Sequence, residues 1–141
     1  MRVRNEGNKI TMSLKVVTGN QIKDQKEACL TINDFSEGVK FLKAIGAQEK
    51  AYQETKREHW HLKNCDITID TWPGLKPYIE IEGKTEKSVR AVCQIMDLDF
   101  KKALFGSVDI IYKKELGIPP DVINNKTPKI TFKNPPKKYK L

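Results

Sequence analysis

Alternation of apolar and polar side chains is the feature that most limits how this chain can fold. In residues 9–17, KITMSLKVV, every second residue from Ile10 to Val16 is apolar, while Thr11, Ser13 and Lys15 fall on the other face. Such two-residue periodicity is typical of a β-strand with one buried face. It recurs in EACLTIN (27–33), ETKREHWHL (54–62), DITID (66–70) and YIEIE (78–82). We therefore predict strands that each have one apolar face and one polar, largely charged face.

Helical signals interrupt these strands. In residues 33–46, NDFSEGVKFLKAIG, Asp34 and Glu37 form a capping-box pattern, and Gly46 fits the end of a helix. Residues 84–98 predict a second helix that begins at a Thr85 cap, and residues 107–117 a third. TWPGLKP (71–77) predicts a turn, and KITF (129–132) predicts one more strand before the chain leaves the fold. The layout is an α+β class, mainly antiparallel β with helices inserted between strands.

The charge of the chain is concentrated at its C-terminal end. The net charge is +8 over 141 residues, and six lysines but no acid follow residue 125. Removing these six charges leaves +2 for residues 1–125. The excess alone therefore does not predict a nucleic-acid-binding protein, because a lysine-rich tail is usually only solvated.

Length and composition indicate a single globular domain in a reducing compartment. No apolar run approaches the roughly 20 residues of a membrane span, so no membrane partner is expected, and the first residues do not resemble a signal peptide. Cys29, Cys65 and Cys93 are odd in number and form no CxxC pair, which argues against disulfides and a cysteine-rich zinc site. We expect a cytoplasmic protein.

The charged strand faces admit two interpretations. In the simpler one they are only solvated. In the other, the apolar faces pack against the helices, the sheet curls, and the charged faces line a concave interior. Unpaired charge in such an interior is costly. Its cations would then bind a polyphosphate, and its carboxylates would bind a divalent metal.

Four segments, in order, carry a resemblance to a known family: RVRNEG with MSLK, KREHW, TIDTWPGLKPYIEIEG and FGSVDIIYKKELGI. The sequence resembles the CYTH family, or triphosphate tunnel metalloenzymes, which includes class IV adenylate cyclases, thiamine triphosphatases and inorganic triphosphatases. The resemblance extends from Arg2 to Pro135. It implies an antiparallel β-barrel that forms a tunnel with helices packed outside, a CYTH-like domain at 1–135 and a basic tail at 136–141.

The resemblance also implies a site, in which basic side chains bind a triphosphate and carboxylates hold Mg²⁺ or Mn²⁺. It assigns phosphate binding to Arg2, Arg4, Lys15 and Arg57, and metal binding to Asp70, Glu80 and Glu82. Lys15, Arg57 and Asp70 are the implied catalytic residues. Such chemistry is coherent, because phosphoryl transfer depends mainly on positioning and on neutralising developing charge.

The sequence departs from the family pattern in two ways. The acid-x-acid-x-lysine signature of the family's first strand is absent, so we expect a barrel that lacks this strand. Its open edge would be a liability that a homodimer could cover. Cys29, Thr31 and Thr68 stand where family members commonly carry acids, and none of them ligates a hard cation as a carboxylate would.

The predicted function is binding of a nucleoside triphosphate, thiamine triphosphate or inorganic polyphosphate with a divalent metal, and whether the chain hydrolyses or cyclises it is left open. The alternative is an inactive phosphate- or polyanion-binding or interaction module on the same fold. Nucleic-acid binding through the lysine tail is the weakest hypothesis.

The histidine pair and the two tryptophans are each given a structural interpretation. His59 and His61, with Cys65 close behind, lack a fourth ligand for a transition metal and are interpreted as lining residues near Arg57. Trp60 and Trp72 are predicted to pack in the core or against helices.

Overall fold

The structure is a computed structural model that describes residues 1–17 and 25–139. The chain divides into two compact units, Met1–Glu49 and Lys50–Leu141. The predicted α+β class with antiparallel sheets is confirmed. The strands of the described residues form three sheets, ordered β1-β2-β3, β4-β8 and β5-β6-β7, and are not closed into the expected barrel. None of the helices in this part of the chain is long and apolar enough to cross a membrane.

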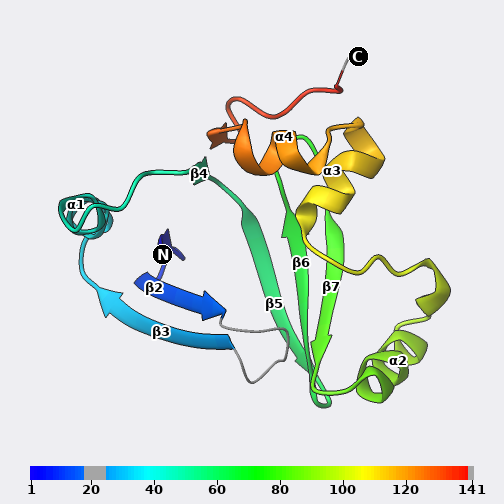
Figure 1. Ribbon diagram of the computed structural model, residues 1–141. Helices are drawn as coiled ribbons and strands as arrows, with labels where there is room; N and C mark the ends of the chain where they lie inside the picture. The colour runs from blue at the N-terminus through cyan, green and yellow to red at the C-terminus, as the bar shows by residue number, and fades with distance from the viewer. Residues whose placement is uncertain (18–24, 140–141) are drawn as a thin grey trace. The chain divides into compact units, whose positions relative to one another are not determined.

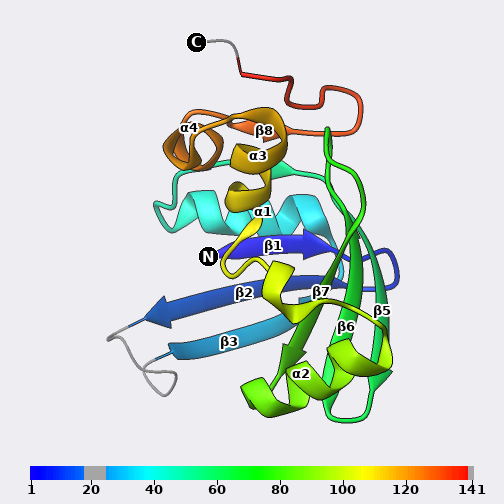
Figure 2. The same cartoon turned by 90° about the vertical axis from the view of Figure 1, so that its right-hand side faces the viewer.

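The first unit is a three-stranded antiparallel sheet with one helix (Figure 2). Its elements are β1 (Arg2–Asn5), β2 (Ile10–Val17), β3 (Gln25–Ile32) and α1 (Phe35–Ala44). The predicted alternation fixes which side of this sheet meets α1. Gly38 of α1 is buried, and a Cβ atom built on it would lie 2.5 Å from Ile32 Cδ1 and 3.1 Å from Val3 Cγ1. The apolar face of this sheet therefore packs against α1.

The predicted capping of α1 is confirmed in part. Asp34 Oδ1 accepts a hydrogen bond from the Glu37 backbone N–H at 2.8 Å. The Glu37 carboxylate does not complete the capping box, because it accepts a hydrogen bond from Lys40 Nζ at 2.7 Å. Gly46 follows the end of the helix with φ +88°, a conformation that glycine adopts without steric cost.

The second unit contains the sheet of β5 (Lys56–Leu62), β6 (Cys65–Thr71) and β7 (Tyr78–Gly83). Helix α2 (Glu86–Ile95) lies across one face of this sheet (Figures 1 and 2). Its Val92 is buried with Cys65 and Ile67 of β6. Thr85 caps α2 as predicted, since its side chain accepts from the Ser88 backbone N–H. As in the first unit, the apolar strand face meets a helix.

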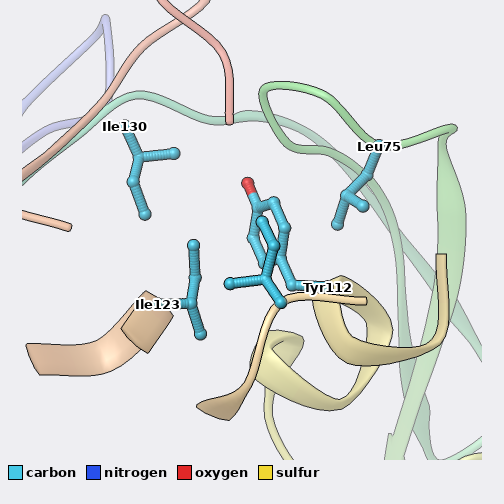
Figure 3. Close-up of a cluster of buried hydrophobic side chains, with 5 residues drawn as sticks. Leu75, Tyr112, Ile123 and Ile130 are labelled. Carbon is cyan, nitrogen blue, oxygen red and sulfur yellow. The ribbon is translucent and has the colours of Figure 1, made fainter. Parts of the chain in front are cut away.

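A second buried cluster forms around Tyr112, between the WPGL turn and the C-terminal elements (Figure 3). Tyr112 is fully buried, and its hydroxyl donates a hydrogen bond to the Pro73 carbonyl at 2.8 Å. Burial raises the pKa of this hydroxyl to about 12. The turn itself is closed by a Leu75 N–H to Trp72 carbonyl bond of 3.0 Å, with Gly74 at φ +83°. These are the features of a type II Pro-Gly turn.

The C-terminal elements differ in part from the prediction. They are the 3₁₀ turn η2 (Phe100–Lys102), α3 (Val108–Leu116), α4 (Pro120–Asn125) and the short β8 (Lys129–Ile130), which pairs in parallel with β4 (Tyr52–Gln53). Helix α4 was not predicted, because the Pro-Pro pair reads as a helix stop; Pro120 instead occupies its first turn, where a missing N–H costs nothing.

Two predictions about packing are wrong. The chain does not leave the fold after β8: the Tyr139 backbone N–H donates to the Leu116 carbonyl at 2.8 Å. A Cβ atom built on Gly74 would also lie 2.7 Å from the Pro136 carbonyl oxygen.

Trp72 packs against the Tyr112 cluster as predicted, but Trp60 is 60% exposed. Lys140, the last of the six lysines, lies outside the described residues.

Candidate functional site

The polar side chains of the second unit gather on the face of the β5-β6-β7 sheet that points away from α2. Strand register places them in three cross-strand rows, because residues directly opposite each other in antiparallel strands share a face. The rows are Arg57–Asp70–Tyr78, His59–Thr68–Glu80 and His61–Asp66–Glu82. We call these nine residues the β5–β7 polar face. The face contains four of the predicted site residues, Arg57, Asp70, Glu80 and Glu82.

Arg57 is the centre of an ion-pair network on this face. Its Nε donates to Asp70 Oδ1 at 2.6 Å, and its Nη2 donates both to Asp70 Oδ2 and, at 3.0 Å, to Glu80 Oε2. The Asp70 side chain is only 2% exposed, whereas that of Arg57 is 47% exposed. A two-pronged guanidinium–carboxylate pair fixes the orientation of both groups. Asp70 therefore holds the inner edge of a guanidinium whose outer edge faces solvent.

The neighbours of this network shift its pKa values. Hydrogen bonding to Asp70 raises the pKa of Arg57, which keeps the guanidinium charged. Burial, with the negative charge of Asp70 beside it, raises the pKa of Glu80 above its ordinary value. Burial also raises the pKa of the Tyr78 hydroxyl, which keeps it protonated and able to donate a hydrogen bond.

Two hydroxyl groups beside the network lack a hydrogen-bond partner within the described residues. They are Thr68 Oγ1 and the Tyr78 hydroxyl, both buried. Thr68 lies two residues from Asp70 on β6, and Tyr78 lies opposite Asp70 on β7. A buried hydroxyl without a partner costs roughly 1–3 kcal/mol, so such groups normally meet a water molecule or a ligand. Tyr78 was not among the predicted site residues, although the alternation that selects Glu80 and Glu82 also includes it.

His59, His61 and Asp66 form a second cluster at the other end of the face. His59 Nε2 and His61 Nδ1 each lie 3.2 Å from Asp66 Oδ1. Contact with His61, and then with His59, lowers the pKa of Asp66. Cys65 is not part of this cluster, because it is buried on the opposite face of β6. The placement of both histidines on the Arg57 face agrees with the prediction.

The first unit has a polar face of its own, on the side of its sheet opposite α1. Strand register aligns Arg2 with Ser13 and Cys29, Arg4 with Thr11 and Thr31, and Lys15 with Glu27. We call these eight residues the β1–β3 polar face. Arg2 and Arg4 thus share a face with Lys15, which the alternation of β2 alone did not reveal. Their roles in phosphate binding stay predictions.

The predicted metal ligands do not fit a divalent ion as they stand. Both oxygens of Asp70 and one oxygen of Glu80 already accept hydrogen bonds from Arg57. Over residues 1–17 and 25–139, no group of three or more His, Cys, Asp or Glu side chains is arranged to hold a metal ion. Metal binding by Asp70, Glu80 and Glu82 nevertheless stays a prediction, since among the described residues Glu82 and the second oxygen of Glu80 accept no hydrogen bond from Arg57.

Comparison with known proteins identifies the family. The sequence matches the CYTH domain over residues 1–105. The chain belongs to the CYTH domain family. CYTH domains form a metal-dependent family that binds triphosphate substrates in a tunnel. The match to this CYTH domain includes both polar faces.

A solved structure supports the fold. The chain is similar to a conserved hypothetical protein from Pyrococcus furiosus, with a TM-score of 0.56 and 18% identity, over 73% of this chain and 70% of that chain. At this identity the likeness concerns the fold alone. The comparison with curated proteins found no match to this chain.

Proposed function

We propose that this CYTH domain binds a triphosphate-containing compound: a nucleoside triphosphate, thiamine triphosphate or inorganic polyphosphate. The observation that carries the proposal is the Arg57 network, in which a guanidinium is fixed by two carboxylates beside the unpartnered hydroxyls of Thr68 and Tyr78. Guanidinium and hydroxyl groups are donors suited to phosphate oxygens. Arg2, Arg4 and Lys15, on the β1–β3 polar face of the first unit, stay proposed phosphate-binding residues.

The charges of the β5–β7 polar face bear on the cofactor. Four carboxylates, of Asp66, Asp70, Glu80 and Glu82, share this face with one arginine. A triphosphate beside such a face needs additional positive charge, which Mg²⁺ or Mn²⁺ supplies in phosphoryl-transfer sites. We keep Lys15, Arg57 and Asp70 as the proposed catalytic residues of a hydrolysing or cyclising activity, as in a triphosphatase or a class IV adenylate cyclase.

Binding without turnover is the second candidate function. It is favoured by the pairing of Asp70 and Glu80 with Arg57, which occupies oxygens that a metal would require. The two candidates differ in one measurable respect. An enzyme releases phosphate or pyrophosphate in a Mg²⁺- or Mn²⁺-dependent manner, whereas a binding module is stabilised by the ligand without releasing product.

The test compares substitution of one arginine, Arg57, with substitution of one lysine, Lys138. Tripolyphosphate, ATP and thiamine triphosphate are titrated with Mg²⁺, Mn²⁺ or EDTA, and melting temperature, affinity and product release are measured. Arg57→Ala is expected to weaken tripolyphosphate binding about tenfold, the scale of one lost charged hydrogen bond. Lys138→Ala, in the exposed C-terminal segment, is the matched control and should change the affinity less than twofold. Equal effects of the two substitutions would contradict the proposal.

The cellular location of the protein belongs to the same proposal. Cys29, Cys65 and Cys93 are odd in number and form no CxxC pair, which favours a reducing compartment. We keep the cytoplasm as the predicted location.

A further inference from the structure

Asp70 is deeply buried although it lies on the β5–β7 polar face. Its side chain is 2% exposed, so it is the most deeply buried of the four carboxylates on the β5–β7 polar face. Isolated burial of an ionised carboxylate is expensive, and only good hydrogen bonds offset the cost. Arg57 provides these bonds, since the two residues lie directly opposite each other on β5 and β6 and both Asp70 oxygens accept from its guanidinium.

The same hydrogen bonds determine which part of Arg57 remains available. Nε and Nη2 make all the bonds to Asp70 and Glu80, and Nη1 makes none of them. A planar guanidinium held along one edge presents its remaining donors in a fixed direction. Because the Arg57 side chain is 47% exposed, these donors are accessible to an anion while the buried carboxylate is not.

We infer that Asp70 is a positioning residue for phosphate recognition, and that this role replaces the catalytic and metal-binding roles carried over from the family pattern: it orients the Arg57 guanidinium and does not ligate a metal ion. This inference rests on the proposed function, because it assigns Asp70 a role in the same phosphate site. Of the three predicted metal ligands, it leaves Glu82, which is exposed, and the partly exposed Glu80 as those that a divalent ion can reach. A fixed guanidinium loses little freedom when it binds an oxyanion, so the expected benefit is affinity.

Three roles of Asp70 predict three different results for Asp70→Asn. If Asp70 is a positioning residue, Asp70→Asn should weaken tripolyphosphate binding about tenfold, which is the scale of losing a residue that orients a ligand. The factor should be the same in EDTA and in Mg²⁺. A metal ligand predicts a loss that appears only with Mg²⁺. A carboxylate that merely repels the anion predicts tighter binding, because the substitution removes a negative charge.

A double-mutant cycle with Arg57→Lys separates positioning from general destabilisation. Lysine keeps the positive charge but cannot form the two-pronged bond. If Asp70 acts through Arg57, Asp70→Asn weakens tripolyphosphate binding in the wild-type background and has no further effect in Arg57→Lys. Additive losses would overturn the inference. Asp70→Glu keeps the charge and shifts the carboxylate by one methylene, so it provides the same test if the asparagine variant does not fold; it too should weaken binding.

Two controls make the outcomes distinguishable. Glu58→Gln removes one negative charge from the opposite face of β5 and should leave the affinity within twofold of wild type. The Arg57 Nε–H resonance in an NMR spectrum of the ligand-free protein should be shifted downfield by Asp70 and should lose this shift in Asp70→Asn; an unchanged resonance overturns the inference. Wild-type protein that does not bind tripolyphosphate refutes the proposed function itself, and the positioning role falls with it. Binding with an additive cycle refutes only the role of Asp70.

Discussion

The charged residues of the β5–β7 polar face differ mainly in what surrounds them. Asp70 is buried under a guanidinium, Glu80 is partly buried beside Asp70, and Asp66 is exposed between two imidazoles. Burial and a neighbouring carboxylate disfavour ionisation of Glu80, whereas hydrogen bonds from the histidines favour ionisation of Asp66. The pKa values of two carboxyl groups on one sheet face are therefore shifted in opposite directions.

The lowered pKa of Asp66 predicts a pH dependence of stability. A carboxyl whose pKa is lower in the folded than in the unfolded protein adds stability above its unfolded pKa, and this contribution disappears as the pH falls through the folded value. The ordinary pKa of an aspartate is 3.8, so the contribution of Asp66 to stability should be present above pH 3.8. It should be lost as the pH falls below 3.8. We expect the unfolding free energy of Asp66→Asn to fall below that of wild type at pH 6 and to converge with it once the pH is well below 3.8.

Direct titration gives a control for this prediction. The carboxyl ¹³C shift of Asp66 should titrate below 3.8, and His61→Asn should raise its midpoint more than His59→Asn, because the His61 contact is the larger cause. A midpoint that neither substitution moves would show that the histidines do not act on Asp66.

Residue placement could be predicted from the sequence where alternation is regular. The two-residue period assigned Arg57, Asp70, Glu80 and Glu82 each to the polar face of its strand, and the strand register places these polar faces on one side of the sheet. The pairing of Arg57 with Asp70 could not be predicted in this way, because it depends on the register between two strands. Alternation assigns a face to each residue, but it does not say which residues lie opposite each other.

At the scale of elements, local sequence signals predicted where helices begin and end better than they predicted how side chains and helices pack. Asp34 and Thr85 are N-caps as expected, and Gly117 ends α3 in the left-handed conformation at φ +70°. These signals act within one turn of backbone. The exposure of Trp60 and the additional helix α4 depend on tertiary contacts, which short-range patterns do not contain.

Gly38 tests how closely α1 packs on its sheet. Alanine is the better helix former, by about 1 kcal/mol, but its Cβ would contact Ile32 and Val3 at less than van der Waals distance. We expect the clash to prevail and Gly38→Ala to destabilise the protein by about 1–2 kcal/mol in urea denaturation. Gly38→Ala with Ile32→Val, which removes the nearest methyl group, should be more stable than Gly38→Ala alone. If Gly38→Ala stabilises the protein, α1 does not pack this closely.

At the scale of the whole molecule, the C-terminal lysines and the C-terminal fold must be considered separately. Residues 126–139 carry five of the six lysines that account for most of the net charge, yet they also include β8 and the buried Ile130. Ile130 packs in the cluster around Tyr112 (Figure 3). The basic segment is thus part of the second unit as well as a source of charge.

Removal of this segment should therefore have a different effect from removal of its charge. Ile130→Ala should destabilise the protein by about 2–5 kcal/mol, as for other buried isoleucines, and deletion of residues 126–141 by more.

Replacing the exposed Lys133, Lys137 and Lys138 by glutamine lowers the net charge by three but touches no buried contact, so the unfolding free energy should change by less than about 0.5 kcal/mol. Any nonspecific affinity for heparin or RNA should then fall, and its salt dependence become shallower, because fewer counterions are released. Tripolyphosphate affinity should stay within twofold of wild type if the ligand binds at Arg57. A loss of tripolyphosphate binding in the triple glutamine variant, with Arg57→Ala unaffected, would place the anion site on the lysines instead.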